Sequence, residues 1–109
     1  MTQRLNGTGR DKVIVYVDPD LEDIVPGFLE NRRKDADTLE AALQRNDLKT
    51  IRLLGHRMKG DGGGFGFEEI STIGDALEQA AIREDRVVIK RETAALVDYL
   101  THVDVVYRR

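Results

Sequence analysis

A histidine and a lysine stand one helical turn apart at the start of a glycine-rich stretch, Gly55 to Phe67 (GHRMKGDGGGFGF). A neutral imidazole is a good nucleophile at physiological pH, so His56 could accept a phosphoryl group. The ammonium group of Lys59 could help to offset the negative charge of that group. Glycines at Gly60 and Gly63 would leave the neighbouring surface without side chains, so that another protein could approach the imidazole.

The same glycines could instead belong to a nucleotide-binding loop, but their spacing argues against it. A Walker loop needs G-x-x-x-x-G-K-[ST], whereas Lys59 precedes the glycines and no serine or threonine directly follows them. A dinucleotide fingerprint would need its last glycine where Phe65 or Phe67 stands, and no strand precedes it. A small phosphate-handling enzyme that uses Lys59 and the glycine backbone stays open as an alternative, which tight binding of ATP or GTP would favour.

A helical wheel places the histidine and the lysine on the exposed side of one helix. The apolar residues at helical spacing that form its buried stripe are Leu48, Ile51, Leu54 and Met58. With Leu54 at 0°, His56 falls at about 200° and Lys59 at about 140°. Asp47 suits the N-cap of this helix. Because glycine is about 1 kcal/mol worse than alanine inside a helix, propensity alone predicts a loop at GDGGGFG.

Amphipathic patterns predict further helices on either side. Asp18-Pro19-Asp20 has the character of a helix start, and Pro26 indicates that this first helix is short and that the chain bends or restarts there. The apolar pattern then resumes and stops near Asn46. A further stripe runs from Phe67 to Ala81, and a last one from about Glu84 to Tyr107. Long amphipathic helices with short connections predict an all-α fold, an antiparallel helical bundle.

Residues 1–17 are predicted to be a flexible or extended N-terminal segment, and residues 18–109 the bundle domain. Within that segment only VIVYV, Val13 to Val17, has the β-branched composition of a strand. No second segment offers a convincing partner strand, so we expect extended chain laid over the core. The run is far too short to span a bilayer, and the polar N-terminus lacks the apolar stretch of a signal peptide.

Composition limits the classes of function. The 109 residues are enough for one domain with one core, and the absence of cysteine excludes a zinc-thiolate site. A net charge of -3 and an aromatic content of 6% argue against nucleic-acid binding. The second histidine, His102, is expected to be solvated, and no metal site is expected. These features favour a cytoplasmic monomer that neither spans nor binds a membrane.

The stretch GHRMKGDGGGFG resembles the signature of histidine-containing phosphotransfer (HPt) domains. In that signature the phospho-acceptor histidine begins H-x-[L/M/I]-K-G, and a glycine follows ten residues after the histidine. The matching residues are His56, Met58, Lys59, Gly60 and Gly66. The downstream segment FEEISTIGDALEQAA is also similar to the next helix of these domains, and the resemblance covers roughly residues 18–105.

The resemblance implies a four-helix bundle with the histidine exposed in mid-helix, and a helix that continues through most of the glycines to a left-handed cap at Gly66. It implies phosphoryl transfer through Nε2 of His56 to and from aspartates of response-regulator receiver domains, with a hybrid histidine kinase as a further partner. Lys59 would stabilise the phosphoryl charge. The residues assigned to the docking surface are Arg52, Arg57, Gly60 and Gly63. No cofactor of its own is implied, because the receiver supplies the magnesium ion.

No kinase motif accompanies the signature, so we expect a free-standing phosphohistidine carrier rather than an enzyme. Two alternatives stay open: a helical module that docks on a kinase or response regulator without accepting phosphate, and the phosphotransfer part of a larger kinase. Asp61 departs from the family, which usually has serine or alanine after K-G. The wheel turns Asp61 away from His56, so this departure bears on transfer rate and partner choice more than on basic activity.

Overall fold

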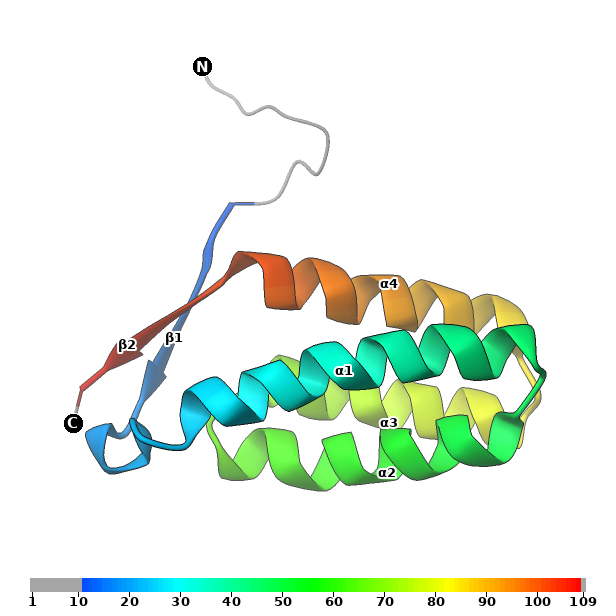
Figure 1. Cartoon of the computed structure of the whole chain (residues 1–109), viewed down its shortest axis with the longest axis horizontal. Coiled ribbons are helices and arrows are strands. Elements are labelled where there is room, and N and C mark those ends of the chain that lie inside the picture. The colour runs from blue at the N-terminus through cyan, green and yellow to red at the C-terminus, as the bar shows by residue number, and fades with distance from the viewer. Residues whose placement is uncertain (1–10, 109) are drawn as a thin grey trace, which may run out of the picture.

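The computed structural model describes residues 11–108. Four α-helices lie along one axis: α1 (Val25–Gln44), α2 (Leu48–Gly64), α3 (Glu68–Ile82) and α4 (Arg86–His102). Figure 1 shows the α1–α2 and α3–α4 connections at one end of the molecule, and the α2–α3 turn with two short strands at the other. The predicted bundle of four helices is present, and two short strands that the prediction did not include are added at one end.

Local capping signals set the helix ends. Asp47 caps α2, because its Oδ1 accepts a hydrogen bond from the Thr50 amide at 3.2 Å and its Oδ2 accepts one from the Thr50 hydroxyl at 2.7 Å. These hydrogen bonds hold the pKa of Asp47 below its usual value. Asp85 caps α4 in the same way. Asn46 and Glu84, with φ of 59° and 58°, take the left-handed conformation that ends α1 and α3.

The long helix α1 begins at Val25, where the restart near Pro26 was expected, but the short helix expected before it is not a full helix. Only Pro19–Leu21 form a 3-10 turn, for which Asp18 Oδ1 accepts a hydrogen bond from the Asp20 amide at 2.9 Å. Pro26 lies at the start of α1, where its missing N–H leaves no intrahelical hydrogen bond unmade. The expected extra N-terminal helix is therefore reduced to a single turn.

Two strands pair where none was expected. β1 (Val13–Val17) runs parallel to β2 (Val103–Tyr107), in register along its whole length. The segment expected to be unpaired is thus a strand, and the last helix, expected to continue to Tyr107, ends at His102. A spacing of four between Val103 and Tyr107 fits a strand as well as a helix, and the β-branched run between them favours the strand. Residues 1–10 of the predicted flexible segment lie outside the described residues.

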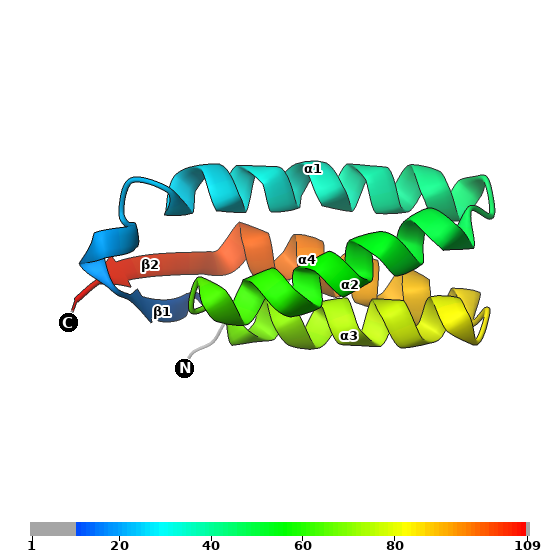
Figure 2. The same ribbon diagram turned by 90° about the horizontal axis from the view of Figure 1, so that it is seen from below.

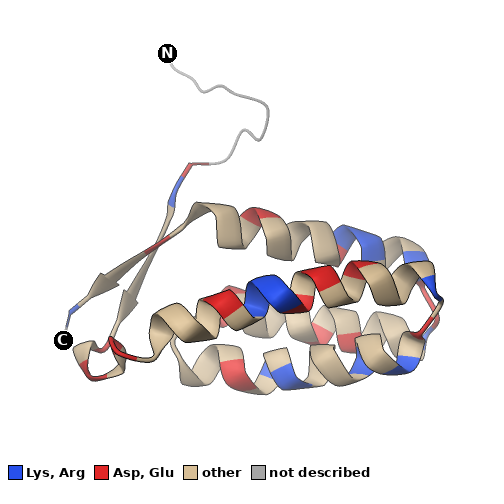
Figure 3. Ribbon diagram, viewed as in Figure 1, with Lys and Arg blue, Asp and Glu red and all other residues tan. Residues whose placement is uncertain are grey.

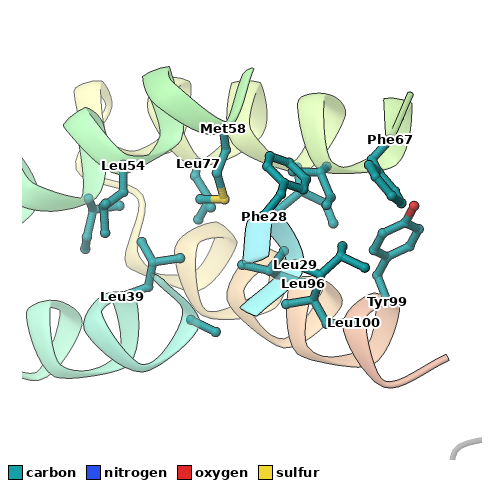
Figure 4. Packing of buried hydrophobic residues seen from close by; sticks show 14 of the residues in the cluster. Phe28, Leu29, Leu39, Leu54, Met58, Phe67, Leu77, Leu96, Tyr99 and Leu100 are labelled. Carbon is teal, nitrogen blue, oxygen red and sulfur yellow. The ribbon is translucent and has the colours of Figure 1, made fainter. Parts of the chain in front are cut away.

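Buried side chains from all four helices form one core. Figure 4 shows Met58 of α2 and Leu77 of α3 pointing into it. Phe28 of α1 stacks on Phe65, with 4.3 Å between ring centroids, and lies 5.5 Å from Phe67. The aromatic contacts hold the C-terminal end of α2 against α1, next to the glycine run.

Helices α2 and α3 cross at glycines, and their backbones lie closer there than any side chain would allow. A Cβ at Gly55 would lie 2.7 Å from the Glu78 amide nitrogen, and one at Gly74 would lie 2.5 Å from the Lys59 amide nitrogen. A Cβ at Gly62 would also meet α3 backbone, at 2.6 Å. Figure 2 shows α2 lying directly along α3. Gly74 therefore lies at a close crossing of the two helices, and backbone contact fixes the position of the side chains beside it.

The glycine run stays helical to Gly64, as the family resemblance implied and against propensity. Gly66, with φ of 91°, takes the expected left-handed conformation just beyond the helix. The Phe67 amide donates to the Gly62 carbonyl at 2.7 Å, and the Gly66 amide to the Gly63 carbonyl at 3.1 Å. This pair of hydrogen bonds closes the last turn of α2.

A hydroxyl of α3 also supports the glycine run. Ser71 Oγ donates to the Lys59 carbonyl at 2.6 Å and accepts from the Gly63 amide at 2.8 Å. Ser71→Ala is therefore expected to lower the free energy of unfolding by about 1 kcal/mol and to speed hydrogen exchange at the Gly63 amide. Thr72→Ala is the matched control, since its hydroxyl bonds within α3, to the Glu68 carbonyl at 3.2 Å. Unchanged exchange in Ser71→Ala would contradict the bridging role.

Candidate functional site

His56 lies in the middle of α2 with its side chain 70% exposed. Its Nδ1 atom is 3.0 Å from Oε2 of Glu78 on α3. An ionised carboxylate only accepts hydrogen bonds, so Nδ1 carries the proton of the neutral ring and donates it. The lone pair is then on Nε2. Helix α3 thus selects which ring nitrogen is free to react.

Lys59 joins the same group one turn further along α2. Its Nζ is 3.2 Å from Asp75 Oδ1 and 3.9 Å from Glu78 Oε1. Glu78 therefore contacts both functional residues of α2, and its side chain is largely buried while those of Lys59 and Asp75 are half exposed. We call His56, Lys59, Asp75 and Glu78 the α2–α3 cluster.

Reasoning from the sequence missed the two carboxylates of this cluster. Asp75 and Glu78 are three residues apart, the same spacing as His56 and Lys59, so each pair occupies one face of its helix. That matching spacing is the available signal. It becomes informative only when the glycine crossing sets α3 against α2 in the observed alignment.

The two glycines assigned to the docking surface differ in their surroundings. Gly60 has open space where a Cβ would stand, as the prediction required. At Gly63 a Cβ would make ordinary contacts at 3.6 Å with side-chain atoms of Glu68 and Ser71. Gly64, which the wheel did not single out, is as open as Gly60. The bare surface near the histidine is therefore made by Gly60 and Gly64, with Gly63 partly covered.

The two arginines assigned to the docking surface point in different directions. Both are exposed, but Arg52 and Arg57 are about 140° apart on the helical wheel. Arg57 faces α1, where burial raises the pKa of Asp35 and the charges of Arg32 and Arg57 oppose that shift. Asp61 lies on the same side, with its Oδ2 4.0 Å from Arg32 Nη1. Asp61 therefore contributes to the contact between α1 and α2 and does not face the histidine.

The surface beside the histidine combines apolar and charged groups. Leu53, one turn before His56 on α2, is 49% exposed, and Ile82 at the end of α3 is 56% exposed. Figure 3 shows mostly basic residues on α2, whereas α3 carries acidic residues and no Lys or Arg. Exposed apolar side chains thus accompany the charged groups of the α2–α3 cluster.

The second histidine is not solvated, which corrects the expectation. The side chain of His102 is 15% exposed, and its Nδ1 is 2.8 Å from the Asp98 carbonyl and 3.3 Å from the Asp98 carboxylate. It closes the last turn of α4, where a donor can bond the free carbonyls. Among residues 11–108 no group of three or more His, Asp or Glu side chains could hold a metal ion. No helix in that range has the length and apolar character needed to cross a membrane.

Comparison with known families agrees with this geometry. The chain matches the Hpt domain family over residues 23–105, a range that contains all four helices and begins after β1. No curated protein and no solved structure matches the chain. Because the family match covers most of the chain and includes the exposed histidine of α2, the chain belongs to the Hpt domain family, whose role is histidine phosphotransfer in phosphorelays.

Proposed function

We propose that the chain carries a phosphoryl group on Nε2 of His56 between the aspartates of receiver domains. The observation that supports this most directly is the 3.0 Å contact between His56 Nδ1 and Glu78, which leaves Nε2 as the free nucleophile of an exposed ring. In the forward step the Nε2 lone pair attacks the phosphorus of a receiver phospho-aspartate. The Nε2–P bond forms, the P–O bond breaks and the receiver carboxylate leaves. The reverse step on another receiver passes the group on.

The α2–α3 cluster supplies the electrostatics of this transfer. The ring gains positive charge as Nε2 shares its lone pair with phosphorus. The hydrogen bond from Nδ1 to the Glu78 carboxylate then strengthens, so Glu78 stabilises the transition state. Lys59, one turn from the reacting ring, offsets the charge of the phosphoryl group.

The partner supplies what this chain does not. A receiver domain would bring the second reacting group and the magnesium ion, so the chain needs no cofactor, binds no ATP and is not an enzyme by itself. It would reach His56 over the open backbone at Gly60, with Leu53 and Arg52 as neighbouring contacts. In-line transfer needs this close approach, because the reacting atoms must align at near-contact distance. We propose a cytoplasmic response regulator or hybrid histidine kinase as the partner.

Glu78→Gln is expected to slow phosphorylation of His56 by about 10-fold. The amide can still accept a hydrogen bond from Nδ1, but it has no negative charge to stabilise the cationic ring. The rate is measured by intact mass with phosphoramidate, a small phosphoryl donor that needs no docking. Glu40→Gln, an exposed change on α1, is the matched control. Equal rates in Glu78→Gln and wild type would show that Glu78 has no part in the chemistry.

The proposed function is tested by mixing the chain with phosphorylated receiver domains from its own cell and magnesium. Intact mass should show one phosphoryl group that is labile in acid and stable in alkali, the behaviour of phosphohistidine. Retained binding to a receiver without any label would favour the docking module instead. Tight binding of ATP or GTP in calorimetry would favour the phosphate-handling enzyme.

A further inference from the structure

The α2–α3 cluster sets one basic side chain against two acidic ones. Lys59 Nζ is 3.2 Å from Asp75 Oδ1 and 3.9 Å from Glu78 Oε1, so its charge is already paired before any phosphoryl group arrives. Glu78 has the His56 ring as a second partner. Within residues 11–108, Asp75 forms no ion pair except the one with Lys59. The two carboxylates therefore have different tasks.

We infer that Asp75 is a positioning residue that sets how readily the phosphoryl group leaves His56. The inference rests on the proposed function and extends it to the equilibrium constant of phosphoryl transfer between His56 and a receiver. A phosphoryl group adds nearly two negative charges at pH 7, beside a cluster that already has an excess of carboxylates. Asp75 competes with that group for Lys59. The competition raises the free energy of phospho-His56 relative to the phospho-aspartate of a receiver, which favours onward transfer.

The expected size of this effect is modest because the cluster is on the surface. Asp75 and Lys59 are 50% and 49% exposed, so water and salt screen their interaction. Removing the carboxylate charge that pairs with Lys59 at 3.2 Å should change the equilibrium constant by about 3-fold. Asp75→Asn is therefore expected to raise the ratio of phospho-His56 to receiver phospho-aspartate by that factor.

Two α3 variants separate this role from a general charge effect. Asp75→Asn and Glu78→Gln each remove one negative charge from α3, three residues apart. Only Glu78 touches the reacting ring, at 3.0 Å from Nδ1, so its loss also withdraws stabilisation from the phosphorylated state. We expect the phospho-His56 ratio to rise in Asp75→Asn and not to rise in Glu78→Gln.

The experiment equilibrates each variant with a phosphorylated receiver and magnesium, and measures both phosphoproteins by intact mass at low and high salt. Asp75→Glu should restore the wild-type ratio, because it restores a carboxylate that can hold Lys59. Asp37→Asn removes the same charge from the groove between α1 and α4, beside Val97, and should change nothing. The rise in Asp75→Asn should shrink at high salt, which a loss of packing would not produce.

The outcomes distinguish this inference from the proposed function. A labelled wild type with an unchanged ratio in Asp75→Asn would overturn the role of Asp75 and leave the phosphohistidine carrier intact. An equal rise in Asp75→Asn and Glu78→Gln would also overturn it, because net charge alone would then explain the ratio. Absence of label on wild type and every variant would overturn the carrier function and the inference together.

Discussion

Replacing His56 with glutamine is expected to abolish phosphorylation completely while the bundle stays folded. The imidazole Nε2 is the proposed acceptor, and an amide nitrogen is not a nucleophile at neutral pH. The side chain is 70% exposed, and glutamine can still donate to Glu78, so the free energy of unfolding should change by less than about 0.5 kcal/mol. Intact mass after incubation with a phosphorylated receiver measures the first effect, and chemical denaturation measures the second.

The other histidine provides the control for that experiment. His102→Gln should keep full phosphorylation, because His102 is 15% exposed and bonded to Asp98 on α4. Binding of the receiver should survive in His56→Gln, since the docking surface lies around the ring rather than in it. A label that persists in His56→Gln would place the acceptor on another residue and contradict the proposed mechanism.

The sequence predicted the helices well because their signals are local. Asp47 caps α2 as expected, and the apolar stripe through Leu54 and Met58 faces the core. Propensity failed at the glycine run, where the family resemblance was needed. The physical reason is that Gly62 lies against α3 and Ser71 bridges the run, so tertiary contacts that no local rule contains hold the helix together.

The strands could not be predicted, because their pairing joins opposite ends of the described chain. VIVYV was correctly seen to have strand composition, but its partner VDVVY follows α4 directly and continues its apolar spacing. Spacing alone does not separate a last helical turn from a short strand at Val103 to Tyr107. Only the parallel pairing decides between them.

Only the half of the site that lies on a single helix could be predicted from the sequence. His56 and Lys59 share one helix, so their spacing shows that they share a face. Asp75 and Glu78 reach them from α3, and their positions follow from how closely the helices cross. The crossing depends on glycines. The sequence alone does not show which glycines pack against α3 and which leave the surface open. Within the motif, Gly55 and Gly62 pack against α3, whereas Gly60 leaves open surface.

This division gives the prediction with the largest effect on stability. Gly74→Ala is expected to lower the free energy of unfolding by about 3 kcal/mol or more, because its Cβ would lie 2.5 Å from the Lys59 amide nitrogen and 2.7 Å from the Gly55 carbonyl oxygen. Both are backbone atoms, so the helices must move apart. Gly60→Ala makes the same chemical change where nothing lies within 4 Å, and should raise stability by up to about 1 kcal/mol. Urea denaturation of the two variants measures both signs.

The same pair of variants links the crossing to the chemistry. Separation of the helices in Gly74→Ala would withdraw Glu78 from Nδ1 of His56, so phosphorylation by phosphoramidate should slow even in the fraction that stays folded. Gly60→Ala leaves that contact in place and adds a methyl group to the docking surface, so only transfer from a receiver should slow. Wild-type stability in Gly74→Ala would mean that side chains, and not backbone contact, set the distance between α2 and α3. The close crossing at the glycines would then not be what brings Glu78 within reach of Nδ1 of His56.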